Sequence, residues 1–444
     1  MREKISVPED VAALCGTLRK AGHRACPVGG CVRDSLLGAE PGDWDVTTTA
    51  APEEVMALFP RSVLTGGAHG TVTVLTEHRA VEVTPFRGES GYSDGRHPDQ
   101  VTFGVSLEED LARRDFTINA MAMDEGGVVV DPFGGMADLE RKLIRCVGDP
   151  DRRFEEDALR ILRALRFAAV HGMDVESHTA AAIHRNRDLL NRLPGERLYA
   201  ELTKLLCGPN VETILLEYPD VLSIPIPEIA PTVGFQQRNP HHCRDVWGHT
   251  AAVVAAAPPA PALRWAALFH DLGKPAVFTL SPDGIGHFYG HAVKSVELAD
   301  AVMSRLRFDN ATRREARFLV EHHDDHLQPT QKAVKRAIQQ FGAHQLRQLL
   351  ALFRADALGH APESARQRLA ICTELEERVH ELAWMGECFT ARDLAIGGEE
   401  LMALGLSGPA IGQAQKRLLA HVLDHPEDNT KEKLREILEA VEHI

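Results

Sequence analysis

The sequence has 444 residues, of which 44% are apolar and 25% are charged, a composition typical of globular proteins and a length sufficient for about two to four domains. The net charge of −15 argues against nucleic-acid binding over the whole surface, although a local basic groove remains compatible with it. No apolar run approaches the roughly 20 residues of a membrane span, and eight scattered cysteines without a Cys-x-x-Cys pair argue against a disulfide framework or structural zinc. Because a signal-peptide pattern is also missing, we expect a cytoplasmic protein without a membrane segment.

The first predicted elements lead to a glycine turn. A capping box over residues 6–9 would open a helix, and a strand over residues 25–28 then runs into Gly29 and Gly30. Glycine lets the backbone come close to a phosphate chain, and Arg33 in the following helix offers a partner for the anion. This turn is therefore a candidate phosphate-binding loop.

Two carboxylates follow the turn. Asp43 and Asp45 are two positions apart in a predicted strand, so their side chains point to the same face. A pair of oxygen ligands in this arrangement suits Mg²⁺, which usually shares its coordination with substrate phosphates. The turn and the carboxylates together indicate a nucleotidyltransferase loop. A glycine turn beside a polar strand end is the purely structural alternative.

The next segments predict a helix, a hairpin and a loop. Residues 52–59 are expected to be helical, and residues 71–75 and 80–84 are expected to pair as strands. Glu82 alternates with valines in the second strand, which suits either a surface glutamate or a third carboxylate beside the aspartates. The polar, glycine-rich composition of residues 86–102 predicts a mobile loop.

A polar stripe follows on a predicted helix over residues 156–167. Asp157, Arg160, Arg163 and Arg166 recur every three residues, and a solvated ion-pair face is one interpretation of this pattern. Base recognition is the other. An arginine donates to a ring acceptor and a carboxylate accepts from an exocyclic amine. Cytosine and adenine present this combination, whereas uracil and guanine present a ring N–H.

These segments resemble the signature of the class II tRNA nucleotidyltransferases, which include the CCA-adding enzymes and bacterial poly(A) polymerases. The matching stretches are Gly-Gly-x-Val-Arg-Asp-x-Leu-Leu-Gly from Gly29, the Asp-x-Asp pair, Arg-Arg-Asp-Phe-Thr-Ile-Asn-Ala from Arg113, and Glu-Asp-x-x-Arg from Glu156. The resemblance implies an α+β fold. A polymerase-β-like nucleotidyltransferase head with a mixed sheet and helices would be followed by all-α neck, HD and tail domains.

The resemblance also implies roles for individual residues. The implied catalytic residues are Asp43, Asp45 and Glu82, with Mg²⁺ held by the two aspartates. The implied nucleotide-binding residues are Gly30, Arg33, Arg114, Asn119, Asp157, Arg160, Arg163 and Arg166. Among these, Asp157 and Arg160 would act as a protein template for the incoming base, and Asp115 would hold the arrangement in place. Residues 86–102 resemble the family's flexible loop, which is needed to switch from adding C to adding A.

From about residue 225 the sequence becomes rich in proline and then in histidine. His249, the doublet His270-Asp271 and the distant Asp356, all on predicted helices, resemble the ligand set of HD-domain metal phosphohydrolases. Imidazole and carboxylate groups together suit Mn, Fe, Ni or Mg, and the bound ion would activate water against a phosphoester.

Two features of the second half remain open at this level. His291 and one of His322 or His323 are either further ligands or residues that cap and pack helices. Residues 404–412 resemble a helix-hairpin-helix turn that would bind RNA phosphate, and a plain helix–helix connection is the alternative.

The expected domains are a head over residues 1–140, a neck over 141–224, an HD domain over 225–375 and a tail over 376–444. The implied function is template-independent addition of C, C and A to the tRNA 3′ end from CTP and ATP, with release of pyrophosphate. An A-adding enzyme or a poly(A) polymerase of the same fold is an alternative. A protein with HD-type phosphohydrolysis as its main activity and a non-catalytic RNA-binding protein are alternatives of other classes. The expected partners are tRNA, CTP and ATP, and the sequence leaves the oligomeric state open.

Overall fold

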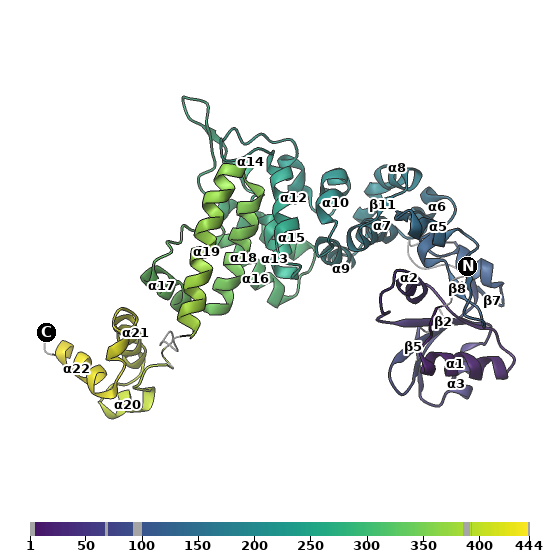
Figure 1. Cartoon of the computed structure of the whole chain (residues 1–444), viewed down its shortest axis with the longest axis horizontal. Helices are drawn as coiled ribbons and strands as arrows, with labels where there is room; N and C mark the ends of the chain where they lie inside the picture. Colours follow the sequence, from purple (N-terminus) through teal and green to yellow (C-terminus); the bar gives the residue numbers. More distant parts are fainter. Residues whose placement is uncertain (1–4, 67–69, 92–99, 385–390, 392, 443–444) are drawn as a thin grey trace. The chain divides into compact units, whose positions relative to one another are not determined.

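The structure is a computed structural model that describes residues 5–66, 70–91, 100–384, 391 and 393–442. The chain divides into two compact units, Met1–Pro227 and Glu228–Ile444 (Figure 1). The predicted α+β class, a mixed sheet with helices followed by a mostly helical remainder, is confirmed. The finer division into head, neck, HD domain and tail stays a prediction. Among the described residues, no helix combines the length and the apolar character that crossing a membrane requires.

The first unit contains a five-stranded mixed sheet with the strand order β1-β2-β5-β4-β3. Strand β2 runs parallel to β5, and the other neighbouring strands are antiparallel. The strands are β1 (Ala25–Pro27), β2 (Trp44–Thr48), β3 (Ser62–Gly66), β4 (Thr71–Leu75) and β5 (Ala80–Pro85). The predicted hairpin of β4 and β5 and the predicted helix α3 (Pro52–Leu58) are confirmed. Helix α3 and helix α1 (Glu9–Lys20) pack together beside the sheet (Figure 1).

The start of the first helix and the polar loop of this unit differ from their predictions. Helix α1 begins after Pro8, whose side chain makes no cap hydrogen bond, so the predicted capping box is absent. Part of the predicted loop forms a ribbon, in which β6 (Arg87–Ser90) pairs antiparallel with β7 (Gln100–Phe103). Strand-favouring residues such as Val101 are set among polar ones there, which hides the ribbon in the composition. Residues 92–99, the centre of the predicted loop, lie outside the described residues.

The first unit continues with short helices and strand pairs. These elements are α2 (Gly30–Leu36), α4 (Leu107–Ala112), η1 (Thr117–Asn119), β8 (Ala122–Met123), β9 (Val129–Val130), α5 (Gly135–Glu140), β10 (Leu143–Ile144), α6 (Pro150–Glu156), α7 (Leu159–His171), β11 (Asp174–Val175), α8 (Ser177–Asn186), η2 (Arg187–Arg192), α9 (Gly195–Leu206), α10 (Val211–Glu217) and α11 (Pro219–Leu222). The prediction of one continuous helix over residues 156–167 is wrong. Asp157 is extended, with φ −144° and ψ 105°, and its carboxylate accepts a hydrogen bond from the Leu159 amide, which ends α6 and starts α7.

The second unit is mostly helical. Its elements up to residue 384 are η3 (Pro227–Thr232), which begins one residue earlier, α12 (Val246–Ala256), α13 (Pro261–Phe269), α14 (Lys274–Val277), β12 (Thr279–Leu280), β13 (Gly286–His287), α15 (His291–Arg305), α16 (Asn310–His322), α17 (Gln331–Phe341), α18 (Ala343–Gly359) and α19 (Pro362–Trp384). Helix α13 is buried along its length, and Trp265 lies at its centre with no exposed surface. The helices α12, α15, α16 and α18 contact one another or α13 and so surround it.

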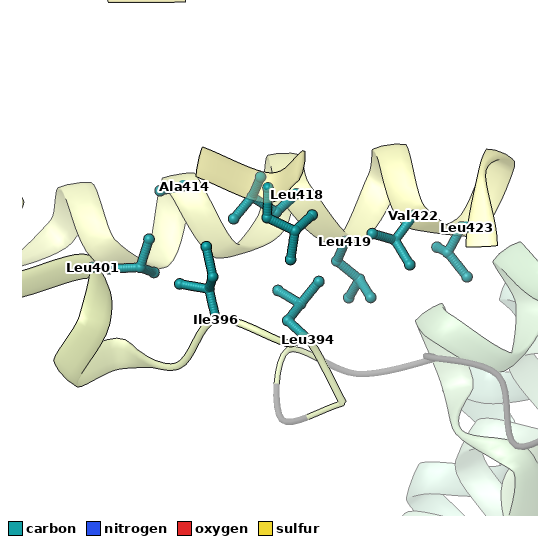
Figure 2. Packing of buried hydrophobic residues seen from close by; sticks show 9 residues of the cluster. Leu394, Ile396, Leu401, Ala414, Leu418, Leu419, Val422 and Leu423 are labelled. Carbon is teal, nitrogen blue, oxygen red and sulfur yellow. The ribbon is translucent and has the colours of Figure 1, made fainter. Parts of the chain in front are cut away.

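The last part of the chain has its own apolar core. It consists of α20 (Gly398–Ala403), α21 (Pro409–Asp424), η4 (Pro426–Asp428) and α22 (Lys431–Glu442). Figure 2 shows alanine, leucine and valine side chains of α21 packed on Leu394, Ile396 and Leu401. The helices α20 and α21 are joined by a short turn with positive φ at Gly405 and Gly408, which both interpretations of residues 404–412 allow. Residues 385–390 and 392 lie outside the described residues.

Candidate functional site

The glycine turn is shaped by the close approach of an arginine. Gly29 has φ 82° and immediately precedes α2, whose first residue is Gly30. A Cβ atom added at Gly29 would lie only 2.7 Å from Nη1 of Arg114. Only glycine therefore permits both the left-handed backbone and the contact with this guanidinium. The result is a positive charge held directly against the turn.

The three predicted carboxylates lie around one end of the parallel strand pair. Asp45 in β2 is the register partner of Glu82 in β5, so both side chains are on the same face of the sheet. Asp43 precedes β2, which begins at Trp44, and its predicted place inside the strand is wrong. Burial raises the pKa of Asp45 to about 6, and the negative charges of Glu82 and Asp43 act in the same direction, against the opposing Arg114. A divalent cation would relieve this repulsion, so the residues fit a metal site.

A polar chain connects the predicted nucleotide-binding residues. Nη1 of Arg33 donates to Oδ1 of Asn119 at 2.6 Å, and Nδ2 of Asn119 donates to Oδ1 of Asp115 at 3.1 Å. Arg163 donates to the other oxygen of Asp115, from Nε at 2.8 Å and from Nη2 at 2.5 Å. Burial would raise the pKa of Asp115, but Arg163 and Asn119 outweigh it and lower that pKa to about 2. Residues far apart in the sequence are thus fixed against one another.

Three arginines surround the ring of Phe167. The guanidinium carbons of Arg33, Arg163 and Arg166 lie 5.1, 5.5 and 4.1 Å from the ring centroid. Nε of Arg166 also lies 2.7 Å from a carboxylate oxygen of Glu201 in α9. The arginines are thus brought to one place by aromatic packing and by buried acids, and they form a local concentration of positive charge in an acidic chain.

The residues predicted to read the base lie at the break between α6 and α7. Arg160 is 8% exposed, so the interpretation as a solvated ion-pair face is wrong for this residue. Its Nη1 donates to Glu156 at 2.7 Å, and its Nη2 donates to the Arg113 carbonyl oxygen at 3.1 Å. The carboxylate of Asp157 lies 3.5 Å from Nη2 of Arg197. The break sets Asp157 outside the helix while Arg160 is held within it.

One residue of this site has no counterpart in the predictions. Asp110 in α4 is fully buried, and its carboxylate accepts hydrogen bonds from Thr47 Oγ1 at 3.1 Å and from Arg113 Nη2 at 2.7 Å. Nη2 of Arg114 lies 3.9 Å away. Asp110 therefore joins β2 to both arginines. The sequence does indicate the contacts of Asp110 with the two arginines, because Arg113 and Arg114 follow it at the helical spacings i+3 and i+4.

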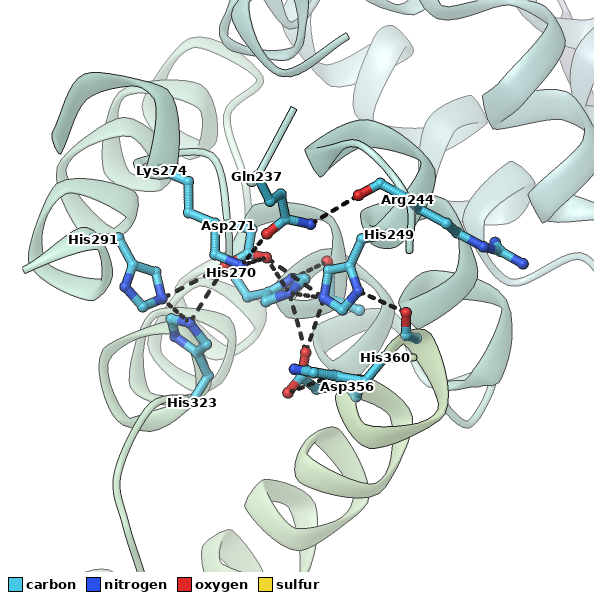
Figure 3. A network of polar contacts seen from close by, with 12 residues as sticks. Gln237, Arg244, His249, His270, Asp271, Lys274, His291, His323, Asp356 and His360 are labelled. Carbon is cyan, nitrogen blue, oxygen red and sulfur yellow. Dashed lines mark hydrogen bonds and ion pairs between the residues drawn. The ribbon is translucent and has the colours of Figure 1, made fainter. Parts of the chain in front are cut away.

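The predicted HD residues converge in the second unit (Figure 3). His249 in α12 lies with its Nε2 2.9 Å from Oδ1 of Asp356 in α18. His270 follows the last residue of α13, and Asp271 lies in the turn beyond it, so the prediction that both are in a helix is wrong. Nε2 of His270 lies 3.1 Å from Oδ2 of Asp271 and 3.4 Å from Nε2 of His249. Four donor atoms of two chemical kinds therefore face a common centre.

Burial and charge act against each other in this centre. Burial opposes ionisation of both carboxyls, yet the neighbouring histidines keep the pKa of Asp271 and of Asp356 well below the ordinary range. Burial likewise opposes a charge on His270, but the Asp271 carboxylate outweighs it and raises the pKa of that ring. The buried carboxylate of Asp271 and the half-buried carboxylate of Asp356, among neutral or protonated imidazoles, are a donor set that fits a divalent cation.

The structure distinguishes the later histidines, which the sequence leaves either as further ligands or as residues that cap and pack helices. His291 and His323 lie beside Asp271, whereas Nδ1 of His322 is 2.7 Å from a carboxylate oxygen of Asp325. Lys274, to which the sequence assigned no role, has its Nζ 2.7 Å from Oδ2 of Asp271. Asp271 is thus contacted from several elements.

Three family models match consecutive parts of the chain. A model described as the poly(A) polymerase head domain matches residues 26–145. A model described as the probable RNA and SrmB-binding site of polymerase A matches residues 172–230, and the HD domain model matches residues 241–361. The matched stretches contain the glycine turn, the aspartate pair and the histidine centre.

Several similar proteins are CCA-adding enzymes. The CCA-adding enzyme of Geobacillus thermodenitrificans is 46% identical over 257 residues, or 58% of this chain and 61% of that protein. The CCA-adding enzyme of Geobacillus kaustophilus is 49% identical over 47% of this chain and 51% of that protein. The alignments thus span about half to three fifths of these curated relatives. The crystal structure of the Bacillus stearothermophilus CCA-adding enzyme in complex with CTP matches 98% of both chains, at 31% identity and a TM-score of 0.72. The chain therefore belongs to the CCA-adding enzyme family of class II tRNA nucleotidyltransferases, and it carries an HD domain in its second unit.

Proposed function

We propose that the protein is a CCA-adding tRNA nucleotidyltransferase, which adds C, C and A to the 3′ end of tRNA from CTP and ATP and releases pyrophosphate. The observation that carries the proposal is the convergence of Asp43, Asp45 and Glu82 beside Arg114 and the glycine turn. The similarity to a CCA-adding enzyme in complex with CTP supports CTP as a substrate. Because the acceptor would be tRNA, we place the protein in the cytoplasm.

The side chains around the glycine turn suit nucleotidyl transfer. Asp43 and Asp45 would hold Mg²⁺ ions, which, when bound, lower the pKa of the tRNA 3′-hydroxyl and balance charge on the triphosphate. Arg114, which is held against the glycine turn, would contact the phosphates. Asn119 would also contact the phosphates. Its amide group is held in place for this by hydrogen bonds with Arg33 and Asp115. The protein thereby supplies orientation and positive charge before the acceptor arrives.

Base selection is assigned to Asp157 and Arg160. Glu156 holds one Nη atom of Arg160, and the Arg113 carbonyl holds the other, so the guanidinium plane has little freedom to turn. A fixed arginine would donate to the ring acceptor that cytosine and adenine share, and Asp157 would accept from their amino groups. Glu156 then has a positioning role, because it acts on the base through Arg160.

Three RNA acceptors would distinguish CCA addition from the addition of A alone and from poly(A) synthesis. A tRNA that lacks the last three nucleotides, a tRNA that ends in CC and an unrelated RNA would be incubated with CTP and ATP, and the products would be sequenced. We expect C, C and A on the first, a single A on the second and no extension of the third. Addition of A alone to both tRNAs would indicate an A-adding enzyme, and long A tails on the unrelated RNA would indicate a poly(A) polymerase.

The HD centre supports a second candidate function, metal-dependent hydrolysis of phosphoesters. The observation that favours it is an open pocket of about 270 Å³ at the histidine centre, which His270, Asp271 and Asp356 line. A second pocket of about 320 Å³ shares Asp356 and Arg368 with it and has apolar walls that include Phe353. The first pocket has room for a phosphate group and the second for an organic group. A bound Mn, Fe, Ni or Mg ion would activate water there.

The two functions are separable by one substitution. His270→Ala removes a ligand from the HD centre and leaves the first unit unchanged. We expect this variant to lose metal-dependent hydrolysis of a nucleoside phosphate ester while CCA addition continues at the wild-type rate. Loss of both activities in a folded variant would contradict the assignment of separate sites.

A further inference from the structure

The second pocket, of about 320 Å³, adjoins the pocket at the HD centre. The residues that line both pockets are His323, Asp324, Asp356 and Arg368. Figure 3 shows two of them, His323 and Asp356, among the residues of the centre. A molecule with one end at the HD centre therefore has room to extend into the second pocket.

Arg368 of α19 places a positive charge where the two pockets meet. Its Nη1 lies 3.4 Å from Oδ2 of Asp356, and its side chain is 48% exposed. Lys274, the other cation of the HD centre, is buried and lies only 2.7 Å from Asp271. A guanidinium has five N–H donors, so a single contact of this length leaves donors for another acceptor. Because arginine binds phosphate through two parallel hydrogen bonds, Arg368 is suited to a phosphate at the centre.

Arg368 begins a stripe along α19 that continues with apolar side chains. Ile371, Cys372 and Leu375 follow it at i+3, i+4 and i+7, which are positions on the same face of a helix. All three line the second pocket and not the pocket at the HD centre. Cys372 and Leu375 are buried, whereas Ile371 is 44% exposed at the rim. The helix thus presents a positive charge beside the centre and an apolar surface beyond it.

The facing walls of the second pocket are also apolar. Phe353 of α18 and Leu327 of the segment after α16 line it, and both pack against the buried cluster that contains Leu375. The helices α18 and α19 are held together by Arg354, which donates to Glu376 at 2.9 and 2.6 Å. The pocket is therefore part of a fixed helix pair, and its aromatic and aliphatic walls suit a flat apolar group.

We propose that the second pocket is the subsite for the organic group of the substrate of the HD centre, and that Arg368 binds the phosphate group. The substrate class is then phosphate esters with an aromatic organic group, which includes nucleoside monophosphates. The metal-binding residues, the guanidinium and the apolar walls follow one another in the same order as the parts of such an ester. The inference deepens the second candidate function, on which it rests.

Two phosphonates test the proposal without an activity assay. Phenylphosphonate and methylphosphonate carry the same anionic group on a C–P bond, which phosphoester hydrolysis does not break, and they differ only in the organic group. Calorimetry would measure their binding to the full-length chain with Mn²⁺, and Asp45→Asn would weaken metal binding at the aspartate pair. We expect phenylphosphonate to bind about ten-fold or more tightly, because only its ring buries apolar surface. Equal affinities for the two phosphonates would overturn the proposal.

Substitutions of exposed residues separate the two parts of the site. Arg368→Ala should weaken both phosphonates by about ten-fold, and Arg368→Lys, which keeps the charge, should restore most of the affinity. Ile371→Asn should weaken phenylphosphonate alone. The controls are Arg366→Ala on the same helix, where Arg366 pairs with Glu363, and Leu358→Asn on α18, and both should bind the two phosphonates unchanged. Unchanged binding after Arg368→Ala, or an unchanged preference for the ring after Ile371→Asn, would overturn the proposal.

The same proteins distinguish this inference from the hydrolytic function. Preferential binding of phenylphosphonate without hydrolysis of phenyl phosphate or adenosine monophosphate would support the subsite and exclude the hydrolase. Hydrolysis of these esters without a preference for phenylphosphonate over methylphosphonate would support the hydrolase and exclude the subsite.

Discussion

Arg163 in α7 donates two hydrogen bonds, at 2.8 and 2.5 Å, to the buried carboxylate of Asp115. The pair fastens the segment after α4 to the helix that carries the predicted base-reading arginine. Because Asn119 donates to the same carboxylate, this contact also orients a residue predicted to meet the triphosphate.

Replacing Asp115 should therefore reduce stability. Asp115→Ala leaves the guanidinium of Arg163, whose side chain is 34% exposed, without its acceptor, so the loss should lie below the cost of about 3–5 kcal/mol for breaking a fully buried ion pair. Urea denaturation at pH 7 should show this loss. Glu125→Ala, a control that removes an exposed partner of Arg19, should change the unfolding free energy by less than about 0.5 kcal/mol. Equal midpoints for both variants would contradict the account.

The pH dependence of the Asp115 effect has a defined sign. The pKa of Asp115 is about 2, below its ordinary value of 3.8, so its stabilisation is present above pH 3.8 and is lost as the pH falls toward 2. The difference in unfolding free energy between the wild type and Asp115→Ala should therefore be constant from pH 7 to pH 5 and smaller at pH 3. A difference that stays the same at pH 3 would exclude this carboxylate as the cause.

The glycine turn offers a matched pair of substitutions. Gly29 and Gly22 both have positive φ, of 82° and 93°, but a Cβ atom would meet Arg114 at Gly29 and nothing within 4 Å at Gly22. Both alanine variants should lose about 1 kcal/mol of stability from backbone strain. Only Gly29→Ala should also lose nucleotide addition, by roughly ten-fold or more, because it displaces the guanidinium. Comparable steady-state kinetics for the two variants would argue against a role of the turn in binding the triphosphate.

The sequence predicts the elements whose signals are local. The alternation of valines around Glu82 and the proline at position 52 were sufficient for β5 and α3. The break at Asp157 was missed, because helix-favouring residues flank it on both sides and the competing signal is one side chain that caps the next helix. An aspartate directly before an apolar run is the feature that indicates such a cap.

Residues whose role depends on distant partners were harder to predict. Asp110 is buried because Thr47, far away in the sequence, and Arg113 satisfy its carboxylate, and no local pattern shows the first of these contacts. The choice between His322 and His323 depends on which of them the end of α16 turns toward Asp271, and adjacent histidines leave that open in the sequence.

The Asp45 carboxylate should lower the stability of the metal-free protein at high pH. Its pKa of about 6 lies above its ordinary value of 3.8, so the folded state without metal is stabilised below pH 3.8 and loses this contribution as the pH rises through 6. With a chelator at pH 8, Asp45→Asn should be more stable than the wild type, on the order of 1–3 kcal/mol. At pH 4 the two should unfold at the same temperature.

Added Mg²⁺ should reverse this order of stability, so that the wild type becomes more stable than Asp45→Asn. Thermal denaturation at pH 8 should show that the ion stabilises the wild type and not Asp45→Asn. The exposed Glu40 provides a control, because Glu40→Gln should respond to Mg²⁺ as the wild type does. If Mg²⁺ stabilises Asp45→Asn and the wild type equally, the ion binds elsewhere.

Substitutions at the helix break should change which base is added. Arg160→Ala removes donors to the ring acceptor of C and A, and Asp157→Ala removes the acceptor for their amino groups. Each bidentate contact is worth roughly 1–3 kcal/mol of discrimination, so misincorporation of U and G should rise by about ten- to hundred-fold. Competition of all four nucleoside triphosphates on one tRNA measures this ratio.

Arg185→Ala is the control for that competition. Arg185 is an exposed arginine that pairs with Asp151 in the same unit, and its removal should leave base choice unchanged. Wild-type fidelity in both Asp157→Ala and Arg160→Ala, at measurable rates, would show that the pair has a structural role only.

The most direct test of the central claim is to sequence the 3′ ends of a tRNA that lacks its last three nucleotides after incubation with the protein, CTP, ATP and Mg²⁺. The wild type should produce ends with C, C and A in that order, and Asp43→Ala and Asp45→Ala should each lower the rate by ~10³-fold or more while remaining folded. Unextended tRNA with the wild-type protein, or undiminished addition by either variant, would contradict nucleotidyl transfer at this aspartate pair.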